Sequence, residues 1–250
     1  MSTSNNNPSR RVVLVGGGGV GGVGKTIVSI AIADLYHQHK VPHTLIDAEE
    51  ENKKGGMLST YFPEAKRLAI DTPGQLDDAL RAALAVRLCL VDLGAGSGRV
   101  TLPWVERVIP WLQSINTTIT LVTPITSHPA SVSAAIEWVN ALRDSVKYLV
   151  IQNKIHGDDF SSLHKSNAGK AFIDGYAPRF ITIEKMWSKY INALEQQRLS
   201  LGQAREAFNL GDPDKRLGPI LGDLVTMFHL EAYFKQIMDQ LESVQELLLP

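Results

Sequence analysis

Short, wholly apolar runs alternate with segments of helical spacing along most of the chain. Such runs predict buried strands of a parallel sheet, because a strand with one solvated face would alternate apolar and polar residues. The predicted strands are residues 12–15, 44–46, 88–91, 118–122, 148–151 and 179–183, and residues 25–39 have the spacing of a helix. The pattern therefore indicates an α/β fold, a mostly parallel sheet with helices on both faces.

The C-terminal part of the chain, residues 186–250, is predicted to be helical, and residues 219–248 form one long helical pattern with a broad apolar stripe. We interpret this stripe as a helix packed on the sheet, with a dimer contact or a partner groove as alternatives. A membrane-lying helix is disfavoured, because Lys235 is its only basic residue. Residues 1–10 are predicted to be a disordered tail and not a signal peptide. No repeat or linker divides residues 11–250, which we interpret as a single domain.

Composition narrows the class of protein. The 250 residues are 44% apolar with a net charge of −1, so no global field attracts nucleic acid or an anionic membrane. No run approaches the ~18 apolar residues of a membrane span, and we expect a cytoplasmic protein. The single cysteine, Cys89, is expected to be a buried strand residue, since no cationic neighbour favours a reactive thiolate. The histidines show no spacing typical of metal ligands.

The strongest chemical signal is Gly19-Val20-Gly21-Gly22-Val23-Gly24-Lys25-Thr26, which lies between a strand and a helix and satisfies G-x-x-x-x-G-K-[ST]. Glycines let backbone N–H groups converge on phosphate oxygens, Lys25 would contact the β- and γ-phosphates, and Thr26 would ligate Mg²⁺. The alternatives are a glycine turn without a ligand and a dinucleotide fingerprint within residues 16–24, which leaves Lys25 and Thr26 without a role. The predicted nucleotide-binding residues are Gly19, Gly21, Gly22, Val23, Gly24, Lys25, Thr26, Ile27 and Asn153.

Carboxylates follow two of the predicted strands. Asp92 ends the strand of residues 88–91, as expected of a carboxylate delivered to Mg²⁺, with Asp71 as a weaker competitor. Asp47 and Glu49 follow residues 44–46 and would position a water molecule or the metal, although an acidic surface loop is the alternative. The predicted catalytic residues are Lys25, Asp47, Glu49 and Asp92, and the predicted metal ligands are Thr26, Asp47 and Asp92. Asn153, which ends the fifth strand, would pair with adenine or cap the turn.

Together these motifs resemble the MinD/ParA group of deviant Walker-A ATPases, a resemblance that spans residues 12 to about 155. It rests on the glycine loop, Leu45-Ile46-Asp47-Ala48-Glu49, Leu90-Val91-Asp92, Thr123-Pro124 and Asn153-Lys154. It implies binding of ATP or ADP with Mg²⁺, a homodimer around two ATP molecules, and a protein partner that stimulates hydrolysis. Val20 stands where the family has a lysine, and Glu49 where many members have an aspartate. Lys53 and Lys54 are the candidates to supply the lost charge, with a solvated loop as the alternative.

Three functions remain open on this basis. The first is a weak ATPase acting as a dimerisation switch, in plasmid partition, conjugation or intracellular positioning. The second is a nucleotide-binding module with little turnover, and the third is a metabolic ligase of the dethiobiotin-synthetase type. DNA binding is a separate and weaker hypothesis, which rests on a basic patch formed by Arg198, Arg205, Lys215 and Arg216.

Overall fold

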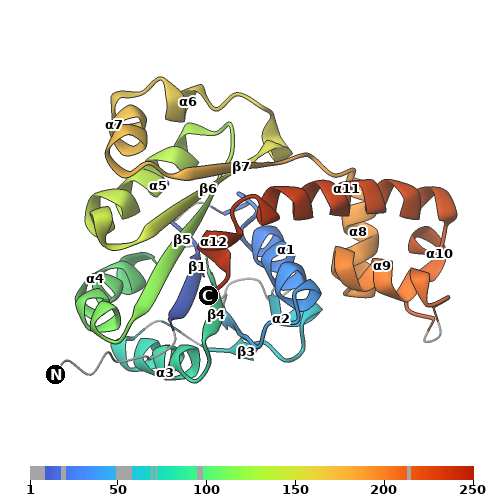
Figure 1. Ribbon diagram of the computed structural model, residues 1–250. Coiled ribbons are helices and arrows are strands. Elements are labelled where there is room, and N and C mark those ends of the chain that lie inside the picture. Colours follow the sequence, from blue (N-terminus) through green and yellow to red (C-terminus); the bar gives the residue numbers. More distant parts are fainter. Residues whose placement is uncertain are drawn as a thin grey trace.

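A single parallel sheet organises the molecule. The computed structural model describes residues 9–17, 21–48, 58–68, 70, 72–94, 98–212 and 215–250. Within these residues seven strands form one sheet in the order β3-β2-β4-β1-β5-β6-β7, and every neighbouring pair is parallel. Helices lie on both sides of this sheet (Figure 1). The predicted α/β class is therefore confirmed.

The strands are β1 (Arg10–Val15), β2 (Thr44–Ala48), β3 (Lys66–Arg67), β4 (Leu88–Leu93), β5 (Thr117–Ile125), β6 (Lys147–Asn153) and β7 (Arg179–Ile183). The helices up to β7 are α1 (Lys25–Gln38), α2 (Leu58–Tyr61), α3 (Pro73–Leu84), α4 (Gly98–Ser114), α5 (Pro129–Leu142), α6 (Ser161–His164) and α7 (Asn167–Tyr176), with the short 3-10 helices η1 (Arg143–Ser145) and η2 (Lys154–His156). The C-terminal helices are α8 (Ser188–Gln197), α9 (Leu201–Asn209), α10 (Gly218–Leu221), α11 (Leu224–Glu242) and α12 (Gln245–Leu248).

All six predicted strands are present, and five of them are longer than the apolar runs suggested. Asp47 and Asp92 lie inside β2 and β4 and do not end them, because their backbone still pairs in the sheet ladder, whereas Asn153 is the last residue of β6 as predicted. The short strand β3 was not predicted. It consists of Lys66 and Arg67 alone, which pair with β2 and give no apolar signal.

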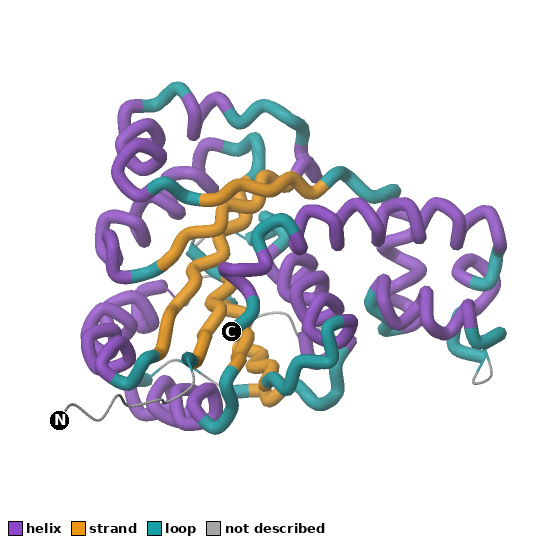
Figure 2. The backbone as a smooth tube through the Cα atoms, in the orientation of Figure 1, coloured by secondary structure: helices purple, strands orange, loops and turns teal. Residues whose placement is uncertain are grey.

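Two apolar cores enclose the sheet, one on each face. In β1, Val12 and Leu14 pack into the core beneath α3, α4 and α5. Their neighbours Val13 and Val15 pack into the opposite core with α1, α2 and the second half of α11. Burying each such side chain contributes roughly 1.5–3 kcal/mol to the stability of the fold. A central strand that is covered on both faces therefore carries apolar side chains on both faces. Figure 2 shows the strand layer between these helices.

A third core belongs to a helical extension, which we define as residues 186–232. Its helices α8, α9 and α10 and the start of α11 pack around apolar side chains that include Tyr190, Leu194, Leu221 and Met227. Helix α11 continues from the extension back to the sheet, so that α8, α9 and α10 lie to one side of the strand layer (Figures 1 and 2). The single-domain interpretation of residues 11–250 stays a prediction.

The prediction of one helix over residues 219–248 is wrong. The segment forms three helices, since Gly222 and Asp223 interrupt it and the Asp223 side chain caps α11 by accepting a hydrogen bond from the Thr226 N–H at 2.8 Å. A second break follows Glu242. The expected packing on the sheet holds for the second half of α11, whereas Leu224 and Phe228 in its first half are exposed, Phe228 by 70%. None of the helices in the described ranges is both long and apolar enough to cross a bilayer.

Candidate phosphate-loop site

The glycine loop leads from β1 into α1. Gly19 and Val20 lie outside the described residues, and the loop is described from Gly21 onward. Gly22 and Gly24 have φ values of +76° and +91°, in the left-handed region that favours glycine. A Cβ on Gly24 would also lie 2.3 Å from Nδ2 of Asn153, so both the backbone and the available space require glycine there.

Helix α1 begins at Lys25 with Gly24 as its N-cap. No side chain caps this fully described helix, and its first turn carries no acidic residue. The first N–H groups of a helix lack partners within it and carry a partial positive charge. The start of α1 is therefore arranged to receive an anion that comes from outside the helix.

Lys25, Thr26 and Ile27 occupy the first turn of α1. Lys25 is buried, with 7% of its surface exposed, whereas Thr26 is half-buried and Ile27 is exposed. A buried ammonium group is costly unless negative charge compensates it. The Lys25 charge lowers the pKa of Asp92, which indicates that the ammonium group and this carboxylate lie close to each other.

Asp47 and Asp92 lie side by side on β2 and β4, as paired residues of the ladder. Both are buried, with 2% and 1% exposure. Oδ2 of Asp47 accepts hydrogen bonds from the backbone N–H of Ser59 at 2.8 Å and from its hydroxyl group at 2.5 Å. The sequence did not reveal Ser59, which lies twelve residues further along the chain.

The hydrogen bonding of Asp92 differs from that of Asp47. Neither of its carboxylate oxygens makes a hydrogen bond of standard geometry with a described residue, although the hydroxyls of Ser29 and Thr26 are near enough to lower its pKa. Burial is the dominant effect and raises the pKa of Asp92 to about 7, and the charge of Asp47 raises it further. A buried carboxylate whose hydrogen bonds are poorly formed destabilises the fold, and a bound cation would offset that cost.

The oxygen atoms at this edge of the sheet fit a small hard cation. Mg²⁺ takes oxygen ligands and usually shares them with a substrate phosphate, so one carboxylate and one hydroxyl are a sufficient protein contribution. Asp92 and Thr26 supply such a pair, with Asp47 next to Asp92. Within the described segments, no group of three or more His, Cys, Asp or Glu side chains is arranged to hold a metal ion.

Asn153 clamps the loop from the end of β6. Its Nδ2 donates to the carbonyl of Val23 at 3.0 Å, and its Oδ1 accepts from the N–H of Ile155 at 3.2 Å. The expected turn cap is therefore present, and the contact with Val23 was not foreseen. An Asn side chain has two N–H donors, so one remains for a base. The role of Asn153 toward adenine stays a prediction.

An apolar pocket lies next to this loop. It runs along α1 from Ile27 to Asp34 and is bounded by the end of β7, by the extension and by α11. Asn153 and Ile183 line the part of its wall that the ends of β6 and β7 provide, and Met186 lines the part that belongs to the extension. The pocket begins one residue after Thr26, and its apolar lining suits a flat ring.

Several other residues that the sequence singled out lie outside the described part of the chain, and Cys89 lies within it. Glu49, Lys53, Lys54 and Asp71 lie outside the described residues, so only Asp92 of the two competing metal ligands has a described environment. Cys89 is fully buried in β4, which confirms the expected buried strand residue, and burial raises the pKa of its thiol to about 12.

Two residues of the predicted basic patch line one groove, and a third forms an ion pair. Arg205 forms an ion pair with Glu231 at 2.5 Å and lies over the ring of Phe234. Arg198 and Arg216 instead line a groove elsewhere on the extension. Arg205 therefore has an acidic partner, and DNA binding through the patch stays a prediction.

No protein-family model matches this sequence, and no curated protein matches it. Among solved structures, the nucleotide-binding protein of Archaeoglobus fulgidus in complex with ADP is similar over 78% of this chain and 87% of its own, with 17% identity and a TM-score of 0.49. FlhF complexed with GMPPNP and Mg²⁺ is similar over 70% of this chain and 66% of its own, with 15% identity and a TM-score of 0.39. Neither similarity assigns a ligand or an activity to this chain.

Proposed function

We propose that this chain binds Mg²⁺ and ATP at the loop of residues 19–26 and hydrolyses ATP slowly. The observation that carries the proposal is the buried Asp92 carboxylate, which lies beside Thr26 and Lys25 and makes no hydrogen bond of standard geometry with a described residue. Without a bound cation, such a buried carboxylate lowers the stability of the fold. It becomes favourable when a cation with bound phosphate completes the site.

Each residue would have a separate task. The N–H groups of the loop and of the first turn of α1 would hold phosphate oxygens, and Lys25 would add a point charge. Thr26 and Asp92 would hold Mg²⁺, which would neutralise phosphate charge when bound. Asp47, held by Ser59, would keep its carboxylate oriented toward the same edge. The base would enter the apolar pocket that begins at Ile27, where Asn153 has an amide proton to donate.

Slow turnover follows from Val20. The family that the sequence resembles has a lysine there, and the loss of a cationic contact in phosphoryl transfer costs orders of magnitude in rate. A nucleotide-binding module without turnover is the second candidate, and the same residue favours it. In either case the bound nucleotide would control assembly into a homodimer, in plasmid partition, conjugation or positioning, with a protein partner.

Calorimetric titration with Mg²⁺ and ATP tests the binding step. We expect Lys25→Ala to weaken binding at least tenfold, whereas Lys170→Ala, an exposed lysine on α7, serves as the matched control and should bind like the wild type. Equal affinity of the Lys25→Ala variant and the wild type would refute the phosphate site. No binding at millimolar ATP in the wild type would refute it as well.

Phosphate release and light scattering separate the two candidates. Release that depends on Lys25 supports the ATPase, and tight binding without release supports the module. A mass that doubles with a non-hydrolysable ATP analogue but not with ADP supports the dimerisation switch. An unchanged mass with both nucleotides would refute the switch while leaving nucleotide binding intact.

A further inference from the structure

Exposed apolar side chains gather on the helical extension. Six of the eight large apolar side chains that are exposed among the described residues belong to it, although the extension is a small part of the chain. Four of these six lie just before α8 and in the first two turns of α11, each exposed by 60% or more: Trp187, Leu224, Val225 and Phe228. Together with the exposed Ala232 they form what we call the extension face. Single exposed apolar residues are ordinary, but a continuous patch marks a contact surface.

The residues of the extension face form one continuous patch. Positions four apart adjoin on a helix, so Leu224, Phe228 and Ala232 make a row along α11. His229 connects this row to α8, because the centre of its ring lies 5.6 Å from that of Phe228 and 5.7 Å from that of Trp187. The patch therefore spans the start of α11 and the start of α8.

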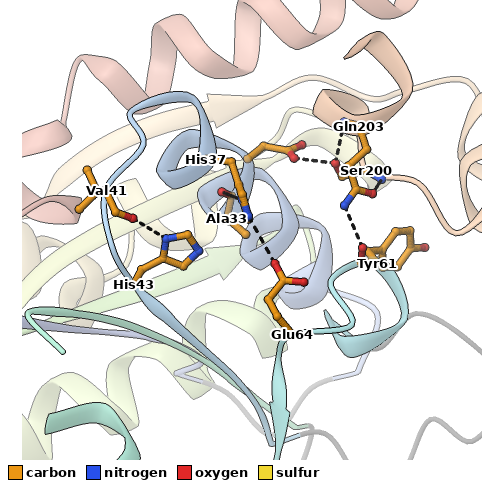
Figure 3. A network of polar contacts seen from close by, with 9 residues as sticks. Ala33, His37, Val41, His43, Tyr61, Glu64, Ser200 and Gln203 are labelled. Carbon is orange, nitrogen blue, oxygen red and sulfur yellow. Dashed lines mark hydrogen bonds and ion pairs between the residues drawn. The ribbon is translucent and has the colours of Figure 1, made fainter. Parts of the chain in front are cut away.

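The extension presents this face on a fixed support. Figure 1 shows the first half of α11 beyond the strand layer. The opposite side of this half-helix, with Met227 and Leu230, packs into the third core. Nε2 of Gln203, on α9, donates to the carbonyl of Tyr61 at 3.0 Å, one of the polar contacts in Figure 3, and so joins the extension to α2. The extension face is thus the uncovered side of a helix whose other side is packed.

Charges around the extension face are balanced within the chain. Glu231, in this part of α11, forms an ion pair with Arg205 at 2.5 Å. Hydrogen bonding to Thr226 lowers the pKa of Asp223, and the nearby charge of Lys189 lowers it further, so this cation and this carboxylate offset each other. The described residues around the face therefore offer no cluster of one charge to attract a nucleic acid or an anionic membrane.

The size of the extension face matches the apolar part of one protein–protein interface. Its side chains expose on the order of 500 Å² of apolar surface, given the usual areas of such side chains. A standard interface takes about 800 Å² from each partner, of which about 60% is apolar. One protein partner is therefore enough to cover the face.

We propose that a second copy of this chain covers the extension face, through antiparallel pairing of the two α11 helices about a two-fold axis at Phe228. Residues equally distant from such an axis meet, so Leu224 of each copy faces Ala232 of the other. A large side chain then lies opposite a small one on both sides of the axis, and the two Phe228 rings pack between them. The order of large, aromatic and small residues is complementary to itself, which is what a two-fold contact requires and a different partner does not.

This contact involves no residue of the phosphate loop and needs no nucleotide. It is therefore separate from the nucleotide-controlled homodimer of the proposed function. Lys25→Ala should leave the extension contact intact, whether or not the loop binds nucleotide. In Phe228→Asp the extension contact is lost, so that a nucleotide-dependent dimer can be measured from a single chain.

Sedimentation equilibrium of the nucleotide-free protein, between about 1 and 200 μM, tests the pairing. We expect the wild type and Lys25→Ala to associate into dimers. Phe228→Asp should weaken this association at least roughly a hundredfold, because two carboxylates would be buried at the centre of the contact. Trp111→Asp is the matched control, since Trp111 is an exposed apolar residue of α4, and it should associate like the wild type. A wild type that stays a single chain, or equal effects of the two changes, would refute the proposal.

Disulfide formation tests the register of the two helices. Phe228→Cys should form a disulfide with its own copy, because the residue lies on the axis. Leu224→Cys and Ala232→Cys should each oxidise slowly alone and rapidly when the two variants are mixed, one of them with a mass tag, since each residue lies about 12 Å from its own copy along the helix and opposite the other. Cys89 does not interfere, because it is buried. Leu224→Cys alone oxidising as fast as the mixture would contradict the antiparallel pairing.

Vesicles of phosphatidylcholine and phosphatidylglycerol provide the last comparison. A single chain that sediments with these vesicles and loses this property in Phe228→Asp would assign the extension face to a lipid surface, and the proposal would be wrong. Dimers in solution that do not sediment with vesicles support the pairing. Far-UV circular dichroism of each variant establishes that these surface changes leave the fold intact.

Discussion

Replacement of Asp34 by Asn probes the junction between α1 and the helical extension. Asp34 is a buried residue of α1, and its Oδ1 accepts a hydrogen bond from the Ser200 hydroxyl at 2.5 Å. Its Oδ2 accepts from the backbone N–H of Gly202 at 3.0 Å. Asp34 thus binds the first turn of α9, whose capping box is formed by Ser200 and Gln203. Asn has nearly the same shape and can keep one of these contacts.

The magnitude follows from the pKa of Asp34, which burial raises from 3.8 to about 6, against the opposing effects of Ser200, Gly202 and His37. At 1.36 kcal/mol per pKa unit, this rise corresponds to roughly 3 kcal/mol of differential stability. The folded state holds the proton more tightly than the unfolded state. The favourable contribution is therefore complete below pH 3.8 and is lost as the pH rises through 6.

Urea unfolding followed by circular dichroism at pH 4, 6 and 8 measures the effect. The Asp34→Asn variant carries no ionisable group there, so it should be as stable as the wild type near pH 4 and roughly 2–3 kcal/mol more stable at pH 8. The difference between the two proteins isolates Asp34 from other titrating groups. A difference of equal size at all three pH values, or a wild type that is more stable at pH 8, would refute this reasoning.

Three further predictions concern the phosphate-loop site and its sheet. Burial raises the pKa of Asp92 from 3.8 to about 7, so Asp92→Asn should stabilise the ligand-free protein by up to roughly 4 kcal/mol above pH 8. The same change should abolish the Mg²⁺ dependence of nucleotide binding. A variant that is less stable than the wild type in urea unfolding would contradict this prediction. Gly24→Ala should lower the unfolding free energy by at least ~1–2 kcal/mol through its φ of +91° alone. Gly21→Ala, whose Cβ would meet no atom of the described residues within 4 Å, should change it little, and equal losses in thermal unfolding would speak against the loop geometry. Cys89, with a thiol pKa of about 12, should react with thiol reagents only on unfolding, so fast labelling of the native protein would contradict its burial.

Much of the sheet could be predicted, because strands that are buried on both faces consist of uninterrupted runs of apolar residues. The runs stop at Asp47 and Asp92, however, whereas the strands continue through these residues. An ionisable residue normally marks the end of a buried strand, and the two carboxylates depart from that rule at the candidate site. The departure itself is informative, since local rules fail most often at functional positions.

The C-terminal helices show what periodicity cannot decide. Leu224 and Phe228 have the helical spacing of a buried stripe, yet the structure exposes them and buries Phe234 and Ile237 further along α11. Spacing shows that apolar residues share a face, but it does not show what covers that face. The break at Gly222 was also hidden, because apolar residues resume directly after Asp223.

The remaining features that the sequence did not predict are side-chain contacts between residues far apart in the chain. Asp34 and Ser200 are separated by 166 positions, and Asn153 and Val23 by 130. No pattern in a single sequence reports such pairs, because they depend on how α9 and β6 come to lie against α1 and its loop. The glycine loop, in contrast, was predictable from a run of eight residues whose role is local.

Hydrogen–deuterium exchange of the amides from Gly21 to Ile27 tests the central claim most directly, since these N–H groups of the loop and the first turn of α1 are the proposed phosphate ligands. Saturating Mg²⁺ and a non-hydrolysable ATP analogue should slow their exchange in the wild type, and the same nucleotide should have little effect in the Lys25→Ala variant. Unchanged exchange in the wild type at saturating nucleotide would contradict the account.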